Sequence, residues 1–159
     1  MLLGMSTFTL IHVVLSLVGI VSGLVVVAGM LQSRRLYGVT LLFLGTMVAT
    51  SVTGFGFVHD RVLPSDVVGV ISLVVLAVAI FAKYVFGLRR SWRGIYVVSA
   101  IAALYLNVFV LVVQAFQKLP LLRALAPTQS DPPFAIVQGL VLLGALALGT
   151  VAVLRFHPD

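Results

Sequence analysis

The chain has 159 residues, of which 62% are hydrophobic and only 9% are charged, and its formal net charge is +6. Soluble domains carry about 25% charged residues. A soluble fold of this length cannot hide so much apolar surface, so we expect its solvent to be lipid. The absence of cysteine excludes disulfides, thiolate metal sites and cysteine nucleophiles.

A membrane-spanning helix needs about 20 apolar residues. Five stretches meet this requirement, and we predict one transmembrane domain over residues 1–159, an all-α bundle of five helices. Their expected bounds are 7–31, 37–58, 66–88, 94–117 and 133–154.

The first stretch lacks the features of a cleaved leader. Its N-terminal flank MLLGMSTF has no Lys or Arg, and the apolar run behind it exceeds twenty residues, so we expect a retained helix. It carries His12, Ser16, Gly19 and Gly23 at steps of four, three and four, which places them on one face. Gly19 and Gly23 form a GxxxG, a pattern that allows another helix to approach closely.

The second stretch carries a stripe of small and hydroxyl residues that includes Thr46 and Thr50, which we expect to serve helix packing. The loop HDRVLPSD follows it, and Ser65 or Asp66 is the expected N-cap of the third helix. Lys83 lies shortly before the basic turn GLRR, so we expect its side chain to snorkel to the membrane surface.

The fourth and fifth stretches are joined by the long connection KLPLLRALAPTQSDPP. Its apolar part, LPLLRAL, is either a short interfacial helix or a coil. Asp131 is the expected N-cap of the last helix, with Pro132 at the first helical position, where its missing N–H does no harm.

The distribution of Lys and Arg over the connections predicts the orientation. One side collects seven basic residues, namely Arg34, Arg35, Lys83, Arg89, Arg90, Arg93 and Arg155. The other side collects Arg61, Lys118 and Arg123 together with three of the four aspartates. We expect the side with seven to be cytoplasmic, which puts the N-terminus outside and the C-terminus inside. This topology explains the whole excess of positive charge, so no nucleic-acid partner is needed, whereas anionic inner-leaflet lipids would be attracted to the sequence RRSWR.

Strongly polar residues gather in the outer half of the predicted bundle, which suggests an outward-facing polar pocket. The candidate ligand or cofactor cluster is His12, Ser16, Asn107, Gln114 and Gln138. For His12 three interpretations stay open. It forms an interhelical hydrogen bond, for example to Asn107 or Gln138, it belongs to a ligand, proton or cofactor site, or it is exposed at the membrane interface.

Motifs that would announce catalysis are missing, since the sequence has no HExxH, GxSxG, Walker loop or dinucleotide fingerprint. Whether the protein is an enzyme therefore stays open, and the missing motifs favour a protein that is not an enzyme. His12 and His59 both fall on the outer side, where two imidazoles would ligate one haem iron. With Asp60 or Asp66 they would instead hold a divalent metal.

The stretch YLNVFVLVVQAFQKLPLLRALAPTQSDPPF, residues 105–134, resembles part of a group of small, uncharacterised bacterial integral membrane proteins. The resemblance covers the C-terminal third of the chain. It implies a multi-pass protein of the bacterial inner membrane, and it brings no catalytic residues.

Three functions are compatible with this sequence. The first is a non-enzymatic accessory or assembly subunit that packs against membrane-protein partners, or against copies of itself, in the lipid bilayer. The second is a redox protein that holds haem or quinone near His12. The third is a binder or transporter of a small solute.

Overall fold

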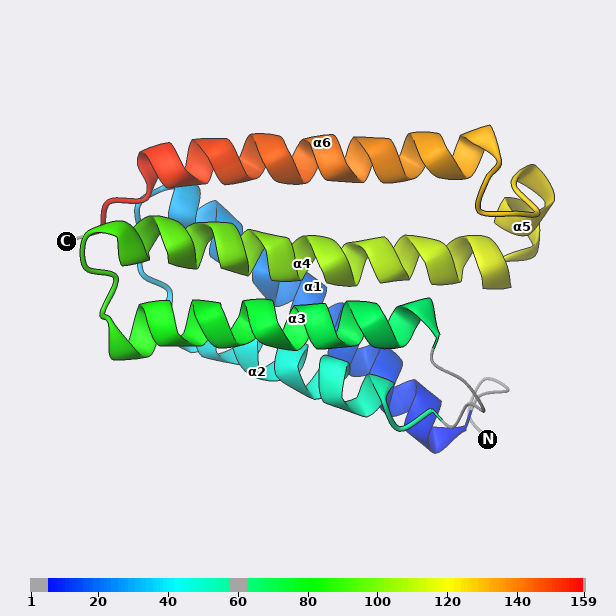
Figure 1. Ribbon diagram of the computed structural model, residues 1–159, viewed down its shortest axis with the longest axis horizontal. Helices are drawn as coiled ribbons and strands as arrows, with labels where there is room; N and C mark the ends of the chain where they lie inside the picture. The colour runs from blue at the N-terminus through cyan, green and yellow to red at the C-terminus, as the bar shows by residue number, and fades with distance from the viewer. Residues whose placement is uncertain (1–5, 58–62, 159) are drawn as a thin grey trace.

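Long helices dominate the computed structural model, which describes residues 6–57 and 63–158 (Figure 1). In lipid every backbone N–H and C=O must be bonded within the segment, and an apolar run achieves this as a helix. The elements are α1 (Thr7–Leu31), α2 (Tyr37–Gly54), α3 (Pro64–Ile80), the π-helix η1 (Phe81–Val85), α4 (Ser91–Lys118), α5 (Pro120–Leu125) and α6 (Pro132–Arg155).

The prediction of an all-α bundle with five long apolar helices is confirmed for the part of the chain that the structure describes. The helices long and apolar enough to cross a membrane are α1, α2, α3 continued by η1, α4 and α6. The bounds of α1 agree with the prediction. The second helix ends at Gly54, earlier than predicted, and the connection LPLLRAL contains the short helix α5.

Local polar contacts explain where helices begin. Ser6 caps α1 by accepting a hydrogen bond from Thr9 N at 3.1 Å. The expected N-cap of the third helix was wrong, because α3 begins at Pro64 and its N-cap is Leu63. Asp66 lies in the first turn instead, where its Oδ2 accepts a hydrogen bond from Leu63 N at 2.8 Å. This bond satisfies a backbone donor that a helix start leaves unpaired.

The third helix does not continue to residue 88 as predicted. It widens into η1 at Phe81 and then enters a turn in which Gly87, Leu88 and Arg90 all have positive φ. Trp92 N donates to Arg89 O at 3.0 Å across this turn, so α4 starts at Ser91, three residues before its predicted start. A π-helical turn followed by left-handed residues lets the chain reverse within a few residues.

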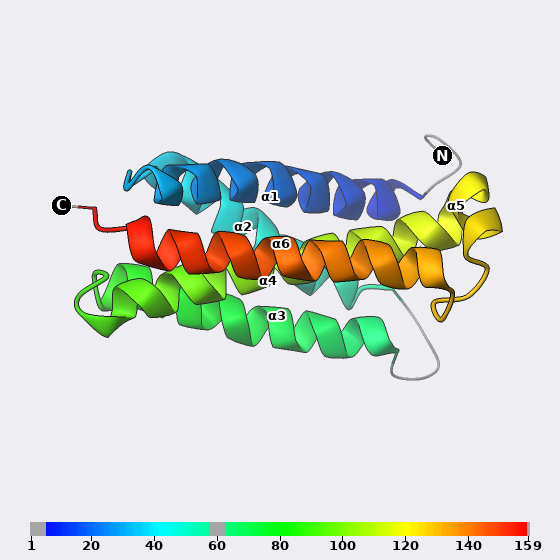
Figure 2. The same ribbon diagram turned by 90° about the horizontal axis from the view of Figure 1, so that it is seen from above.

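Four helices form a closed ring. Each of α1, α2, α3 and α4 packs against the next, and α4 packs back against α1, while α6 lies outside the ring against α4 and α1. Figures 1 and 2 show that the chain termini lie at opposite ends of the bundle. This is the arrangement that an odd number of crossings produces.

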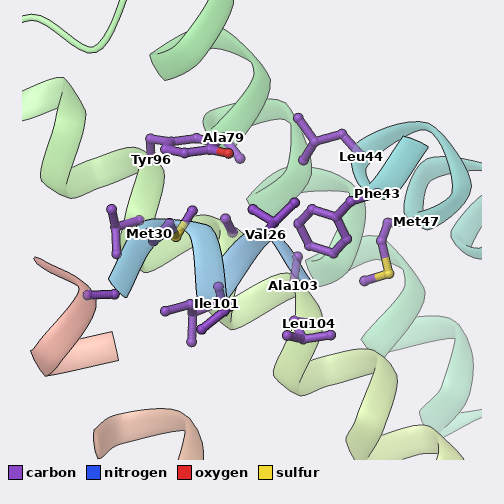
Figure 3. Close-up of a cluster of buried hydrophobic side chains, with 14 of the residues drawn as sticks. Val26, Met30, Phe43, Leu44, Met47, Ala79, Tyr96, Ile101, Ala103 and Leu104 are labelled. Atoms are coloured by element: carbon purple, nitrogen blue, oxygen red, sulfur yellow. The ribbon is translucent and has the colours of Figure 1, made fainter. Parts of the chain in front are cut away.

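The apolar core lies between the four ring helices (Figure 3). Large side chains such as Phe43 and Met47 of α2 fill it beside Met30 of α1, and each is at most 2% exposed. Ala79 of α3 and Ala103 of α4 are fully buried. Alanine at these points allows the helix backbones to approach closely, which is how helices associate where lipid competes for apolar contacts.

The two ends of the bundle differ in charge. At the "basic end" α1 and α6 end and α4 begins, and its residues Arg34, Arg35, Lys83, Arg89, Arg90, Arg93 and Arg155 come from loops and helix ends. At the opposite end, the "α5 end", Lys118 and Arg123 are accompanied by Asp66 and Asp131. Residues on loops that are far apart in the sequence are thus brought together by the helix reversals.

Candidate functional site

His12 is bonded to a neighbouring helix. Its Nδ1 lies 2.8 Å from Thr53 Oγ1 of α2, and its ring meets Phe57 edge-on, with ring centroids 5.2 Å apart. The expected partners Asn107 and Gln138 are therefore replaced by Thr53. His12 lies near the start of α1 and Thr53 near the end of α2, so the antiparallel packing of the two helices brings them together at the α5 end.

The hydrogen bonds of Thr53 identify the protonated nitrogen of His12. A threonine hydroxyl has one proton to donate. Thr53 directs it to its own helix, to Ala49 O at 2.7 Å, with Thr50 O at 3.1 Å. Thr53 Oγ1 therefore accepts from His12 Nδ1–H, which leaves Nε2 as the nitrogen with a free lone pair in the neutral ring.

Ser16 and Asn107 form the second interhelical contact of the predicted cluster. Ser16 Oγ donates to Asn107 Oδ1 at 2.8 Å. Asn107 Nδ2 uses its two protons toward Ser16 O at 3.2 Å and Met47 Sδ at 3.1 Å. One buried amide of α4 therefore joins α1 and α2.

The two glutamines of the predicted cluster lie on different helices. Gln138 belongs to α6 and bonds to α4, and Gln114 belongs to α4. Gln138 Nε2 of α6 donates to Phe109 O of α4 at 3.1 Å. The Oε1 atoms of Gln114 and Gln138 are buried and have no hydrogen-bond partner among the described residues. These hydrogen bonds divide the cluster into a set on α1, α2 and α4 and a separate bond between α4 and α6.

The glycines of the GxxxG face lie inside the bundle. A Cβ added to Gly19 would come within 3.0 Å of Met47 Sδ and 3.3 Å of Thr46 Oγ1. A Cβ on Gly23 would meet Phe43 at 2.7 Å and Leu104 at 2.9 Å. Gly19 therefore receives side chains of α2, and Gly23 receives side chains of α2 and α4, so this face is occupied by the chain's own helices.

The hydroxyls of the threonine stripe point back to their own helix. Thr46 Oγ1 donates to Leu42 O at 2.7 Å, and Thr50 Oγ1 donates to Thr46 O at 2.8 Å. Each hydroxyl thereby uses its single proton on a carbonyl of its own helix. Thr46 and Thr50 thus contribute small packing surfaces and no polar link between helices.

The proposed pairing of His12 with His59 lies outside the described residues, as does Asp60. Within residues 6–57 and 63–158, no group of three or more His, Asp or Glu side chains lies close enough to hold a metal ion. A haem or quinone would have to be bound through His12 Nε2, the free ring nitrogen of the described cluster.

The basic end contains groups that sequence reasoning did not select. Lys83 does not snorkel to the surface as expected, because its side chain is only 8% exposed. Its Nζ lies 5.3, 5.7 and 5.2 Å from the ring centroids of Tyr37, Tyr84 and Tyr96. The spacing in the sequence was a sign of this burial. Lys83 follows Leu76 and Ala79, which are buried, at steps of seven and four, so the three residues share one helical face.

Two other arginines of the basic end are bonded to backbone carbonyls of the C-terminal segment. Arg35 Nη2 donates to Pro158 O at 3.2 Å. Arg93 Nη1 donates to Val153 O at 3.0 Å and also to Phe156 O. His157 N donates to Ser33 Oγ at 2.9 Å, so the segment after α6 is tied to the loop between α1 and α2.

Comparisons of the chain with protein-family models, with curated proteins and with solved structures find no match. A functional proposal for this protein therefore rests on its own residues.

Proposed function

We propose that the protein is a multi-pass protein of the bacterial inner membrane and a non-enzymatic accessory or assembly subunit of a membrane complex. One observation carries this proposal. Polar side chains inside the bundle bond across helices, as Ser16 does with Asn107 and His12 does with Thr53. Polar contacts of this kind hold membrane helices together at about 0.6 kcal/mol each.

The orientation that we propose follows from charge. The basic end faces the cytoplasm, because Lys and Arg accumulate in the cytoplasmic loops of inner-membrane proteins. The α5 end and the N-terminus then face the outside.

The subunit proposal is tested by the size and composition of the protein in native membranes. A tagged chain is solubilised in digitonin, separated by native electrophoresis and analysed by mass spectrometry. We expect it to migrate with a membrane partner or with further copies of itself at a fixed stoichiometry. His12→Ala should reduce the assembled fraction because it loosens α1 from α2, while Thr150→Val, which changes an exposed hydroxyl of α6, should not. Migration of the wild-type protein as a single chain alone would contradict the proposal.

A redox function is the alternative, and the free Nε2 of His12 favours it. A histidine ligand usually holds its metal with one ring nitrogen while the other donates a hydrogen bond. Nδ1 of His12 is in contact with Thr53 Oγ1, and it is the donor when the Thr53 hydroxyl directs its proton to Ala49 O. The test is an absorption spectrum of the purified protein before and after dithionite, with His12→Ala alongside. A Soret band that shifts on reduction and disappears in the variant would establish haem. A spectrum without such a band leaves quinone, which mass spectrometry of co-purified molecules would reveal.

A solute binder or transporter has less support. Such a protein needs polar groups along a path through the bundle. Between the Ser16–Asn107 contact and the basic end, the core is formed mainly by apolar side chains such as Val26, Phe43 and Leu104. Buried hydroxyls in this part of the core, such as those of Ser22 and Ser99, bond to carbonyls of their own helices. Among the described residues they therefore do not join the polar contacts near the α5 end to the basic end by a continuous polar path.

A further inference from the structure

Lys83 places a cation where a membrane protein rarely leaves one. It belongs to the apolar segment Pro64–Val85 and is 92% buried, with an ammonium group that has three protons to donate. The tyrosine rings around it attract the charge by cation–π interaction but accept no conventional hydrogen bond from it. The described acids, Asp66 and Asp131, lie at the opposite end of the bundle and cannot neutralise it.

Arg35, at the same end of the bundle as Lys83, also has a donor without a hydrogen-bond partner. Its Nη2 is bonded to Pro158 O, while its Nε is buried and has no partner among the described residues. A buried donor without an acceptor costs about 1–3 kcal/mol, and more when the group is charged. Arg35 therefore needs an acceptor on the side of its Nε.

Lys83 and Arg35 line one small cavity, and Arg34 lines it with them. The other residues of its wall include Thr40 and Tyr96, which are 2% and 1% exposed. Its volume is about 10 Å³, close to the minimum that holds a single water-sized atom group. Three cations around one such space repel each other, and an anionic oxygen placed there would replace repulsion by attraction.

We propose that this cavity is a binding site for one oxygen of a phosphate group, held by Lys83, Arg35 and Arg34. Lys83 would supply a buried point charge, and the guanidinium of Arg35 would donate through its unpaired Nε. Because the cavity admits a single oxygen, the remainder of the phosphate group lies outside it. A water molecule would fill the same volume but would leave three positive charges uncompensated.

In the membrane the phosphate would come from an anionic phospholipid. This source rests on the proposed membrane location, whereas the chemistry of the site does not. Two of the three rings beside Lys83 reach the surface: Tyr37 of α2 and Tyr84 of η1 are 63% and 51% exposed. The neighbouring side chains of Leu41 and Val85 are 65% and 63% exposed. Aromatic rings favour the headgroup region and apolar side chains favour the acyl chains, so the surface continues the site in the way that a lipid would require.

The test is the thermal stability of the full-length protein in dodecylmaltoside micelles. Phosphatidylglycerol, phosphatidylcholine or inorganic phosphate is titrated at constant ionic strength. A ligand that binds the folded state raises Tm in proportion to its occupancy. We expect a saturable rise with phosphatidylglycerol that exceeds the rise with phosphatidylcholine. Lys83→Met and Arg35→Gln should each weaken the apparent affinity by about tenfold or more, because each removes a charge-assisted hydrogen bond to the phosphate oxygen.

Two control variants separate this site from general charge. Arg155→Gln removes an exposed charge of the basic end that does not line the cavity, and it should keep the wild-type response. Asp159→Asn removes a carboxylate that lies outside the described residues, and it should also keep it. A lipid response that appears only in Asp159→Asn would make that carboxylate the occupant and would overturn the proposal.

The titrations with phosphatidylglycerol and with inorganic phosphate distinguish the source of the phosphate group. Saturable binding of inorganic phosphate that displaces phosphatidylglycerol supports the site with a soluble ligand, and a response to the lipid alone supports it with a headgroup. Arg35→Gln keeps the test decisive if Lys83→Met does not fold. No saturable response of the wild-type protein, or an unchanged response in the variants of Lys83 and Arg35, would overturn the proposal. None of these results depends on whether a protein partner exists, so the subunit proposal stands or falls separately.

Discussion

The side-chain amide of Asn107 shows how a single polar residue organises this bundle. It receives a hydrogen bond from Ser16 of α1 and donates to Ser16 O and to Met47 Sδ of α2. An unpaired amide would be costly in an apolar surrounding. These bonds therefore favour one rotation of α1 and α2 about their axes and one position along α4. Apolar contacts alone would specify both only weakly.

At the scale of one hydroxyl, Thr53→Val tests the link between His12 and α2. Valine keeps the shape of threonine but cannot accept the bond from His12 Nδ1, so we expect the free energy of unfolding to fall by about 0.6 kcal/mol. Thr150→Val is the matched control, because the Thr150 hydroxyl also donates to the carbonyl one turn earlier, Leu146 O, but bonds to no other helix among the described residues. Reversible unfolding in mixed dodecylmaltoside and SDS micelles, followed by circular dichroism, measures both variants. Equal losses in the two would contradict the role assigned to Thr53.

At the scale of the elements, α1 is held by close approach as much as by polar bonds. Gly23 receives Phe43 from α2 and Leu104 from α4 at distances that leave no room for a methyl group. Gly45 of α2, by contrast, has nothing within 4 Å of an added Cβ. Substituting alanine at these two glycines therefore distinguishes two effects: the loss of close helix packing at Gly23 and the gain in helix propensity at Gly45.

Gly23→Ala should destabilise the bundle by about 1–3 kcal/mol, since the methyl group would force α1 away from α2 and α4. Gly45→Ala should leave the stability unchanged or raise it by about 0.5–1 kcal/mol, because alanine favours the helix and meets no neighbour. The same micellar unfolding assay compares them. A Gly23→Ala variant as stable as Gly45→Ala would show that α1 does not pack as described.

At the scale of the whole molecule, the helix reversals sort the charges. The reversals between α1 and α2 and between η1 and α4, together with the end of α6, bring basic residues together, although these are spread from Arg34 to Arg155 in the sequence. The segment after α6 then folds back on the first loop through the bonds of Arg35 and Ser33. The basic residues on which the expected orientation rests thus also hold the segment after α6 against the loop between α1 and α2.

The proposed orientation is tested by labelling engineered cysteines, for which a chain without native cysteine is suited. Gln32→Cys places an exposed thiol at the basic end and Gln129→Cys places one at the α5 end. A membrane-impermeant maleimide should label Gln129→Cys in intact spheroplasts and Gln32→Cys only after permeabilisation, because the basic end is expected in the cytoplasm. The reverse pattern would invert the topology and with it the lipid leaflet proposed to meet Lys83.

Part of the candidate site was accessible from the sequence. The steps of four and three along α1 placed His12, Ser16 and the two glycines on one face, and depth along the helices brought Ser16 near Asn107. The partner of His12 was not predictable, since Thr53 is one of several hydroxyls on α2 and periodicity does not reveal which helix faces which. The burial of Lys83 was missed for a related reason. A lysine near a membrane boundary usually snorkels, and only the neighbouring tyrosines of α2, η1 and α4 show that this one is enclosed.

The sequence by itself determined the class of the molecule. Runs of apolar residues as long as a bilayer is thick, broken by short polar turns, predict long helices, so the number of long apolar helices and most of their bounds follow from hydropathy. Only the tertiary structure decided which polar groups meet, because contacts such as those of Asn107 with Ser16 and of Lys83 with Tyr37 depend on the rotation and neighbours of each helix. Apolar faces are nearly equivalent in lipid, and the choice among them is made by close packing at glycine and alanine and by a few buried hydrogen bonds.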